Sequence, residues 1–371
     1  MRTSIRPRLI VAGLILAVLA SLGNTNLSRR LRADELQRLP QERDLTDSEN
    51  SDSETPDAQN PTPANPDGEN QTAPPKPEKK ASSNFNWATK TGGGTQLWTD
   101  HCFRDGFRVQ QNALTGHWRI LDPRDVRRGW GSEDHCRGVL DQIHPEEGQA
   151  ETPKHYVVLL HGLMRSHHSM KPVAAALAEQ GHEDVIRFAY ASTRSSISDH
   201  SAALREVLED LPDGTQFSFV GHSMGNIVVR HMLGRLQEDD PEHLLTRFHS
   251  MVMLGPPNQG AAISRRLAPT GLYGWITGKG GMELGPQWES FAQQLATPSF
   301  PFLIIAGDVS QLPLPMQLKN PLVDGSSDFV VSVDEARLEG AEALETVPVL
   351  HSFLMNDSDS LQLTVDFLMS H

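Results

Sequence analysis

The segment Gly221-His-Ser-Met-Gly225 places a serine between two glycines, directly after the apolar run 217–220 and before a stretch with helical spacing. A serine in a sharp strand-to-helix turn projects its hydroxyl from the sheet edge, and glycines at 221 and 225 let the turn pack closely. The helix start also aims N–H groups at an anionic intermediate. A bare Gly-x-Ser-x-Gly arises by accident in roughly one chain in ten of this length, but the flanking elements make it specific. We predict Ser223 as a nucleophile, with an ordinary tight turn as the alternative.

A serine hydroxyl needs a base, because it is a poor nucleophile at neutral pH unless a histidine accepts its proton. In a strand–serine–helix arrangement the chain order is serine, acid, histidine, so the base must lie late. Of the 16 histidines, His351 follows the apolar stretch 347–350 and precedes the last helical segment, whereas His371 is the final residue. We predict His351 as the base, and a surface loop histidine is the alternative.

Three aspartates are candidates for the acid that orients this histidine. Asp328 lies in Gly325-Ser-Ser-Asp-Phe-Val-Val331, a turn that runs into hydrophobic residues and can fix a carboxylate. Asp324 lies just before it, and Asp308 follows the predicted strand 302–306 early in this part of the chain. The acid would hold the correct tautomer and stabilise the imidazolium. We predict Asp328, with Asp324 and then Asp308 as alternatives.

An acyl-transfer site also needs donors to the oxyanion. His161-Gly-Leu163 closes the predicted strand 156–160, and Met224 comes directly after the nucleophile. The N–H groups of Leu163 and Met224 are the expected pair, and one such donor lowers the barrier by about 3 kcal/mol. A simple strand-ending turn at 161–163 is the alternative. We expect His161 to be structural and His222 to support the turn at Ser223.

The sequence offers no metal-binding pattern. It has no Cys-x-x-Cys or Cys/His zinc spacing, and the pair His167-His168 has no nearby carboxylate or thiolate cluster, so no metal site is expected. Cys102 and Cys136 are the only cysteines. In an exported chain they could form a disulfide, if their Cα atoms approach closely enough, and both states stay open.

The elements that must position these residues alternate along the segment 151–371. Predicted strands cover 156–160, 184–190, 216–220, 248–254 and 302–306, and predicted helices 170–180, 197–211, 226–236 and 359–369. This alternation predicts an α/β fold with a mostly parallel, doubly wound sheet flanked by helices. Residues 261–299, rich in glycine, interrupt the alternation. They are either a cap or lid over the site or a rigid structural insertion.

Three segments precede this catalytic domain. Residues 1–23 have a basic start and an apolar run, the layout of a secretory signal peptide, with a membrane anchor and a buried helix as alternatives. Residues 24–86 are rich in proline and polar or acidic residues, which predicts a disordered linker. Residues 87–150 contain an alternating pattern over 107–121 around Thr115-Gly116, a predicted β-hairpin. We therefore expect a secreted, periplasmic or membrane-tethered protein.

The chain resembles the bacterial lipase and esterase branch of the α/β-hydrolase superfamily over residues 154–371. The resemblance rests on Leu160-His-Gly-Leu163, Gly221–Gly225, Leu254-Gly-Pro-Pro-Asn-Gln-Gly260, Ser327–Val331 and Val349-Leu-His351. It implies the α/β-hydrolase fold, an ester or lipid substrate and acyl-enzyme chemistry without a cofactor. Ser223 would attack the ester carbonyl, and His351 would act first as base and then as acid. Some related lipases bind structural calcium, and nothing in this sequence places such a site.

The net charge and the triad candidates also bear on other classes of function. The net charge of −14 disfavours binding to nucleic acid, because an acidic chain repels phosphate backbones. The same triad also serves thioesterases and acyltransferases, so these remain alternatives. A non-catalytic binding protein tethered to the envelope is a further alternative, and it would be favoured if nucleophile, acid or base had no candidate.

Overall fold

The computed structural model describes residues 96–144, 153–261, 279, 281–285, 287–312 and 323–371, which all belong to one compact unit, residues 84–371. The predicted segments 1–23 and 24–86, and residues 262–278 of the predicted lid, lie outside the described residues. Within the described part, no helix is both long and apolar enough to cross a membrane.

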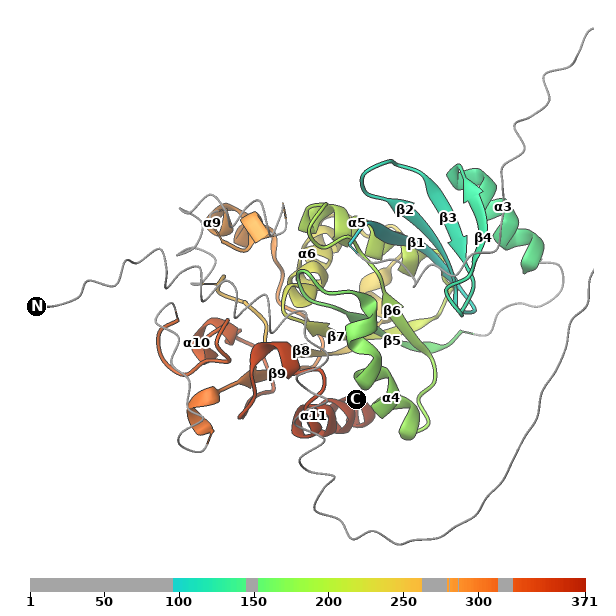
Figure 1. The fold of residues 1–371 in the computed structure, drawn as a ribbon. Helices are drawn as coiled ribbons and strands as arrows, with labels where there is room; N and C mark the ends of the chain where they lie inside the picture. Colours follow the sequence, from blue (N-terminus) through green and yellow to red (C-terminus); the bar gives the residue numbers. More distant parts are fainter. Residues whose placement is uncertain (1–95, 145–152, 262–278, 280, 286, 313–322) are drawn as a thin grey trace, which may run out of the picture. The chain divides into compact units, whose positions relative to one another are not determined.

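In the described chain, a central sheet of six parallel strands has the order β10-β9-β8-β7-β5-β6 (Figure 1). The strands are β5 (His155–Leu160), β6 (Val185–Phe188), β7 (Gln216–His222), β8 (Phe248–Leu254), β9 (Phe302–Gly307) and β10 (Ala343–Val347). The chain starts at β5, adds β6 on one side, returns to β7 on the other side and then runs outward to β10. This doubly wound order confirms the predicted fold class, and it brings the carboxyl ends of all six strands to one edge.

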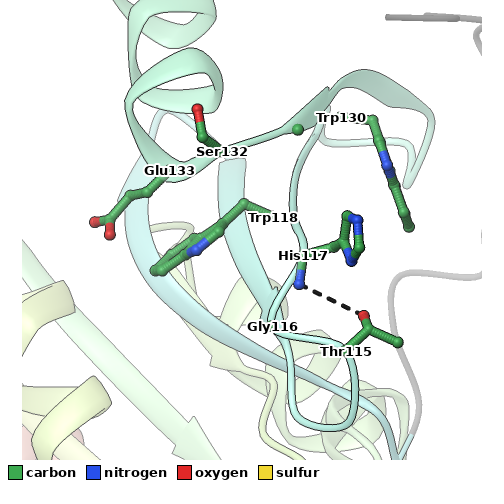
Figure 2. A pocket seen from close by; sticks show the side chains of 8 residues that line it. Thr115, Gly116, His117, Trp118, Trp130, Ser132 and Glu133 are labelled. Carbon is green, nitrogen blue, oxygen red and sulfur yellow. Dashed lines mark hydrogen bonds between the residues drawn. The ribbon is translucent and has the colours of Figure 1, made fainter.

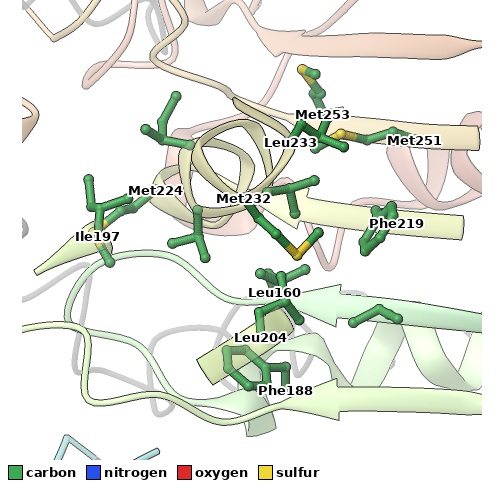
Figure 3. Packing of buried hydrophobic residues seen from close by; sticks show 14 of the residues in the cluster. Leu160, Phe188, Ile197, Leu204, Phe219, Met224, Met232, Leu233, Met251 and Met253 are labelled. Carbon is green, nitrogen blue, oxygen red and sulfur yellow. The ribbon is translucent and has the colours of Figure 1, made fainter. Parts of the chain in front are cut away.

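Helices cover both faces of this sheet. On one face α4 (Lys171–Glu179) contacts α11 (Ser358–Ser370), and on the other α5 (Ile197–Glu209) contacts α6 (Met224–Glu238). Consecutive residues of β5 enter different apolar clusters, since Val158 and Leu160 pack with α5 and α6 (Figure 3), whereas Val157 and Leu159 pack with α4 and α11. Burial on both faces explains why the inner strands are continuous apolar runs.

The N-terminal part of the described chain forms a separate antiparallel sheet in the order β1-β2-β3-β4. Its strands are β1 (Trp98–Arg104), β2 (Phe107–Asn112), β3 (Trp118–Leu121) and β4 (Arg127–Gly131), followed by α3 (Glu133–Ile143). The predicted hairpin over 107–121 appears as the pair β2–β3, in which Gln111 lies opposite Trp118. The sheet attaches to the segment after β6, because the backbone N–H of Asp100 donates to the carbonyl of Ala189 at 2.9 Å.

Both cysteines lie in the apolar core between this sheet and α3. Cys102 of β1 and Cys136 of α3 are buried as free thiols beside Val109, Ile120 and Leu140. Burial raises the pKa of Cys136 to about 11 and raises that of Cys102 as well. The disulfide that the sequence left open is not formed in this structure, and the raised pKa values favour the protonated form of both thiols at neutral pH.

Candidate active site

Ser223 occupies the turn between β7 and α6 in a backbone conformation that residues other than glycine rarely adopt, with φ 54° and ψ −121°. A non-glycine residue in this region is strained, and such strain is typical of a serine held at the tip of a strand-to-helix turn. The N–H of Ser223 donates to the carbonyl of Leu254 at 2.8 Å, so the neighbouring strand β8 fixes the turn.

The two glycines of the motif are required by close approach. A Cβ at Gly221 would lie 2.2 Å from Oδ1 of Asn226, and a Cβ at Gly225 would lie 2.6 Å from the carbonyl oxygen of Leu160. Asn226 braces the turn, since its Nδ2 donates to the carbonyl of Ser223 at 3.1 Å. Sequence reasoning did not single out Asn226. The available signal was a polar residue within the largely apolar start of the predicted helix.

The structure brings Asp328 and His351 into direct contact. Nδ1 of His351 lies 2.6 Å from Oδ2 of Asp328, and the N–H of His351 donates to the carbonyl of Asp328 at 2.9 Å. The other carboxylate oxygen, Oδ1, accepts the N–H groups of Val330 at 2.9 Å and Val331 at 2.7 Å. Both Asp328 and His351 are buried. The turn after Asp328 therefore fixes this carboxylate in one orientation, facing the imidazole.

The two alternative acids, Asp308 and Asp324, have different surroundings. Asp308 caps the short helix η5 (Val309–Gln311), and its Oδ1 accepts from the N–H of Ser310 at 3.0 Å. Burial raises the pKa of Asp308, but the hydrogen bonds from Ser310 and Gln311 outweigh it and hold this pKa below its usual value. Asp324 is exposed on the loop before Asp328. Neither carboxylate has a contact with His351 among the described interactions.

Ser223 and His351 both adjoin the end of β8. Ser223 bonds to Leu254, and a Cβ on the next residue, Gly255, would lie 3.0 Å from Nδ1 of His351. A Cβ on Gly307, at the end of β9, would lie 2.6 Å from Cβ of Asp328. The serine, the histidine and the aspartate thus gather at the carboxyl edge of the central sheet, where parallel α/β sheets bind their ligands.

His222 links the serine turn to the histidine loop. Its Nε2 lies 3.0 Å from the backbone carbonyl oxygen of His351, and the two rings have centroids 4.9 Å apart. Burial, followed by the charges of His351 and Arg165, holds the pKa of His222 well below its usual value. A neutral ring that donates from Nε2 supports the loop of His351, whereas the sequence suggested that His222 supports the turn at Ser223.

The loop after β5 lies against the serine turn. A Cβ on Gly162 would lie 3.1 Å from Cβ of Ser223, so Leu163 follows close to the nucleophile. The N–H of Leu163 has no hydrogen-bond partner within the described residues, and Met224 begins α6, where an N–H has no partner inside the helix. Both N–H groups are therefore available as donors at this edge.

The loop itself is held by buried and partly buried polar contacts. The N–H of Met164 donates to Oγ of Ser192 at 3.1 Å, and Nη2 of Arg165 donates to the carbonyl of Ser352 at 3.1 Å. The Tyr190 hydroxyl donates to the carbonyl of His161, whose ring stacks on the tyrosine. Burial lowers the pKa of His161 to about 4. His161 is therefore a neutral structural residue, as the sequence suggested.

A hollow of about 510 Å³ lies elsewhere, between the β2–β3 turn and the start of α3 (Figure 2). Its lining includes His117, Trp118 and Trp130 and none of the predicted catalytic residues. It belongs to the N-terminal sheet and is distinct from the carboxyl edge of the central sheet.

The sequence placed no carboxylate or thiolate cluster near His167-His168, but the structure brings one carboxylate to this pair. Asp125, in the turn between β3 and β4, lies beside both histidines in the structure. The contact joins a turn of the N-terminal sheet to the helix η1 (His167–Met170) after β5, so neither spacing nor periodicity along the chain could reveal it. These three residues are the group within the described chain whose ligand atoms could hold a metal ion.

Residues 150–267 match the protein family described as "Putative serine esterase (DUF676)". The match covers less than half of the chain and includes Ser223 and Leu163, but it ends before Asp328 and His351. No curated protein matches the sequence.

Several solved structures resemble this one at low identity. The mature lipase BlEst2 of Bacillus licheniformis has 20% identity and a TM-score of 0.45, over 60% of this chain and 95% of that one. A Listeria innocua gene product has 18% identity and a TM-score of 0.42, over 59% and 95% of the two chains. Phospholipase PlaB of Legionella pneumophila has 16% identity and a TM-score of 0.37, over 49% and 45%. At this level they say nothing about activity. The parallel sheet and the strand–serine–helix turn give the chain the α/β-hydrolase fold, and residues 150–267 of this fold match a serine esterase family.

Proposed function

We propose that the protein hydrolyses carboxylic esters through an acyl-enzyme intermediate, with Ser223 as nucleophile, His351 as base and Asp328 as acid. The match of residues 150–267 to a serine esterase family supports ester hydrolysis in the broad sense. The observation that carries the finer proposal is the 2.6 Å contact between Oδ2 of Asp328 and Nδ1 of His351, at the sheet edge that also holds Ser223.

This contact has a direct chemical consequence. A carboxylate accepts hydrogen bonds, so Nδ1 of His351 carries the proton and Nε2 keeps its lone pair. Nε2 can then remove the proton of the Ser223 hydroxyl as the serine attacks the ester carbonyl. Asp328 stabilises the imidazolium that forms, and its second oxygen stays bound to the N–H groups of Val330 and Val331.

The attack produces a tetrahedral intermediate whose oxyanion needs donors. We assign this role to the N–H groups of Met224 and Leu163, which flank the nucleophile from α6 and from the loop after β5. The amino end of α6 adds a partial positive charge on the same side. The imidazolium returns its proton to the leaving alcohol, and a water molecule activated by His351 then releases the acid from Ser223.

We also propose that the enzyme acts outside the cytoplasm on ester or lipid substrates. The support is the basic and apolar pattern of residues 1–23, which lie outside the described part of the structure. The predicted linker 24–86 would hold the catalytic domain away from a membrane if the first segment is retained.

Hydrolysis of short-chain and long-chain p-nitrophenyl esters tests the proposal. Ser223→Ala should lower kcat by at least about 10³-fold, because the nucleophile is lost while the fold is kept. Ser370→Ala, at the exposed C-terminal end of α11, should keep the wild-type rate. A fluorophosphonate should add its mass to Ser223 in the wild type and in Ser370→Ala, but not to Ser223→Ala. Equal rates for the wild type and Ser223→Ala would end the esterase proposal, and a new ester formed in added alcohol would indicate acyl transfer.

A further inference from the structure

Two histidines and an aspartate from different parts of the fold meet beside the loop after β5. Asp125 lies in the turn between β3 and β4, and His167 and His168 begin the short helix η1 (His167–Met170). One ligand atom from each residue lies within 4.8 Å of the other two. Imidazole nitrogen and carboxylate oxygen are the ligand types of zinc, and three protein ligands with one water form a common zinc site.

The state of His167 points to a missing ligand. Its side chain is 1% exposed, and neither ring nitrogen has a hydrogen-bond partner within the described residues. Buried polar groups in folded proteins are nearly always paired, so an unpaired buried imidazole calls for an explanation. Its ring lies against that of His168, with centroids 4.1 Å apart. A metal ion between the rings and Asp125 would use a nitrogen that otherwise has no partner.

The carboxylate of Asp125 is oriented for this role. Oδ1 pairs with the guanidinium of Arg108, whereas Oδ2 faces Nε2 of His168 at 4.0 Å. A ligating carboxylate is commonly held by an outer partner of this kind. Asp125 adopts φ 62°, which an aspartate tolerates, and its N–H donates to the carbonyl of Asp122 at 2.9 Å. The turn thus presents Oδ2 to the histidines.

The surrounding charges do not exclude a cation. Arg108 and Arg187 lie near the histidines and disfavour a further positive charge there. The carboxylates of Asp100 and Asp125 lie close to these arginines and favour a positive charge. The side chains of His168 and Asp125 are 31% and 21% exposed, so a water ligand can reach the cluster from solvent.

We propose that Asp125, His167 and His168 bind one zinc ion, with water as a fourth ligand, and so fasten the N-terminal sheet to the catalytic domain. Zinc ligands about 2.0–2.1 Å from the metal lie about 3.4 Å from one another in a tetrahedral site. The three ligand atoms now lie within 4.8 Å of one another, so small side-chain rotations bring them to this distance. The site shares no residue with the proposed serine, histidine and aspartate, and it is independent of the esterase proposal.

Zinc binding by the tag-free full-length chain tests the proposal. The protein is stripped with a chelator, loaded with zinc chloride and desalted, and its zinc content and its affinity in competition with a chromophoric chelator are measured. The wild type should hold one zinc per chain. Loss of an outer-shell partner already costs about 10–100-fold in metal affinity, so His168→Gln and Asp125→Asn should each cost at least about 100-fold.

Two controls separate this site from adventitious binding and from misfolding. His182→Gln removes a histidine from a separate histidine group, which also includes His155 and His249, and should leave zinc binding unchanged. Zinc should raise the melting temperature of the wild type and of Ser223→Ala, but not that of His168→Gln, whose partly exposed side chain can change without loss of the core. No zinc on the wild type, or equal affinity in the wild type, His168→Gln and Asp125→Asn, would overturn the proposal.

Discussion

Nε2 of His222 lies 3.0 Å from the backbone carbonyl oxygen of His351. A carbonyl oxygen only accepts, so His222 carries a proton on Nε2. Because burial holds the pKa of His222 well below its usual value, the ring is neutral at working pH. This bond joins the residue before the proposed nucleophile to the proposed base, and it fixes the distance between the two loops that must act together.

Replacement of His222 tests whether this bond positions the base. We expect His222→Phe to lower kcat about 3- to 10-fold with little change in KM, since one hydrogen bond contributes about 0.5–1.5 kcal/mol. His222→Gln, whose amide can still donate to the His351 carbonyl, should recover part of the rate. Steady-state kinetics on a p-nitrophenyl ester provides the measurement. A wild-type kcat in the phenylalanine variant would show that the bond has no positioning role.

Asp328→Asn should be the most damaging single change among the candidate acids. The amide can donate to Nδ1 of His351 and so favour the wrong tautomer, which in a serine triad lowers kcat by about 10⁴. Asp324→Asn is the matched control, because this exposed residue should keep a nearly wild-type rate. Loss of rate in Asp324→Asn with a normal rate in Asp328→Asn would show that the acid is misassigned.

The serine turn should not accept a side chain at its second glycine. A Cβ at Gly225 would lie 2.6 Å from the Leu160 carbonyl oxygen, so Gly225→Ala must displace backbone and should lower the free energy of unfolding by more than about 2 kcal/mol. Gly138, in α3, has nothing within 4 Å of an added Cβ. Gly138→Ala should therefore raise this free energy by about 0.5–1 kcal/mol. Urea unfolding measures both changes, and the same sign in both variants would contradict the argument.

The buried strands were predictable because burial on both faces demands continuous apolar residues. β5, β7, β8 and β9 meet this condition, and their predicted bounds agree with the structure to within a few residues. β10 was missed, because it lies at the sheet edge and its segment Ala-Leu-Glu-Thr-Val is mostly half-exposed. The helix α3 was missed because its buried face holds little more than Cys136 and Leu140.

The candidate site, like the fold, was predicted from the sequence only in part. Turn chemistry and chain order selected Ser223, His351 and Asp328 as candidates, and the structure places the last two in contact, while their roles stay predictions. The brace from Asn226 is local to the serine turn, and its only signal was a polar residue in a largely apolar segment. The approach of Asp125 to His167 is a contact between separate elements, and no local pattern encodes such a contact.

His200 should make the protein less stable in acid. It is buried in α5 against the ring of Tyr190, and both its ring nitrogens lack a hydrogen-bond partner within the described part of the chain. Burial lowers its pKa to about 3, whereas an unfolded histidine titrates near 6.5. Between these two values the unfolded chain binds a proton that the folded chain does not. The stability that neutral His200 preserves is therefore complete above about pH 6.5 and is lost as the pH falls, by up to about 1.4 kcal/mol per pH unit.

Urea unfolding between pH 6 and pH 4 measures this dependence. His200→Phe keeps an aromatic ring beside Tyr190 but cannot bind a proton at this position. As the pH falls, the free energy of unfolding should therefore decrease less steeply in this variant than in the wild type, and the two slopes should differ by about 1.4 kcal/mol per pH unit. The exposed His243 serves as the control, and His243→Gln should keep the wild-type slope. If His200→Phe and the wild type show the same slope, His200 is not the buried neutral group that its surroundings indicate.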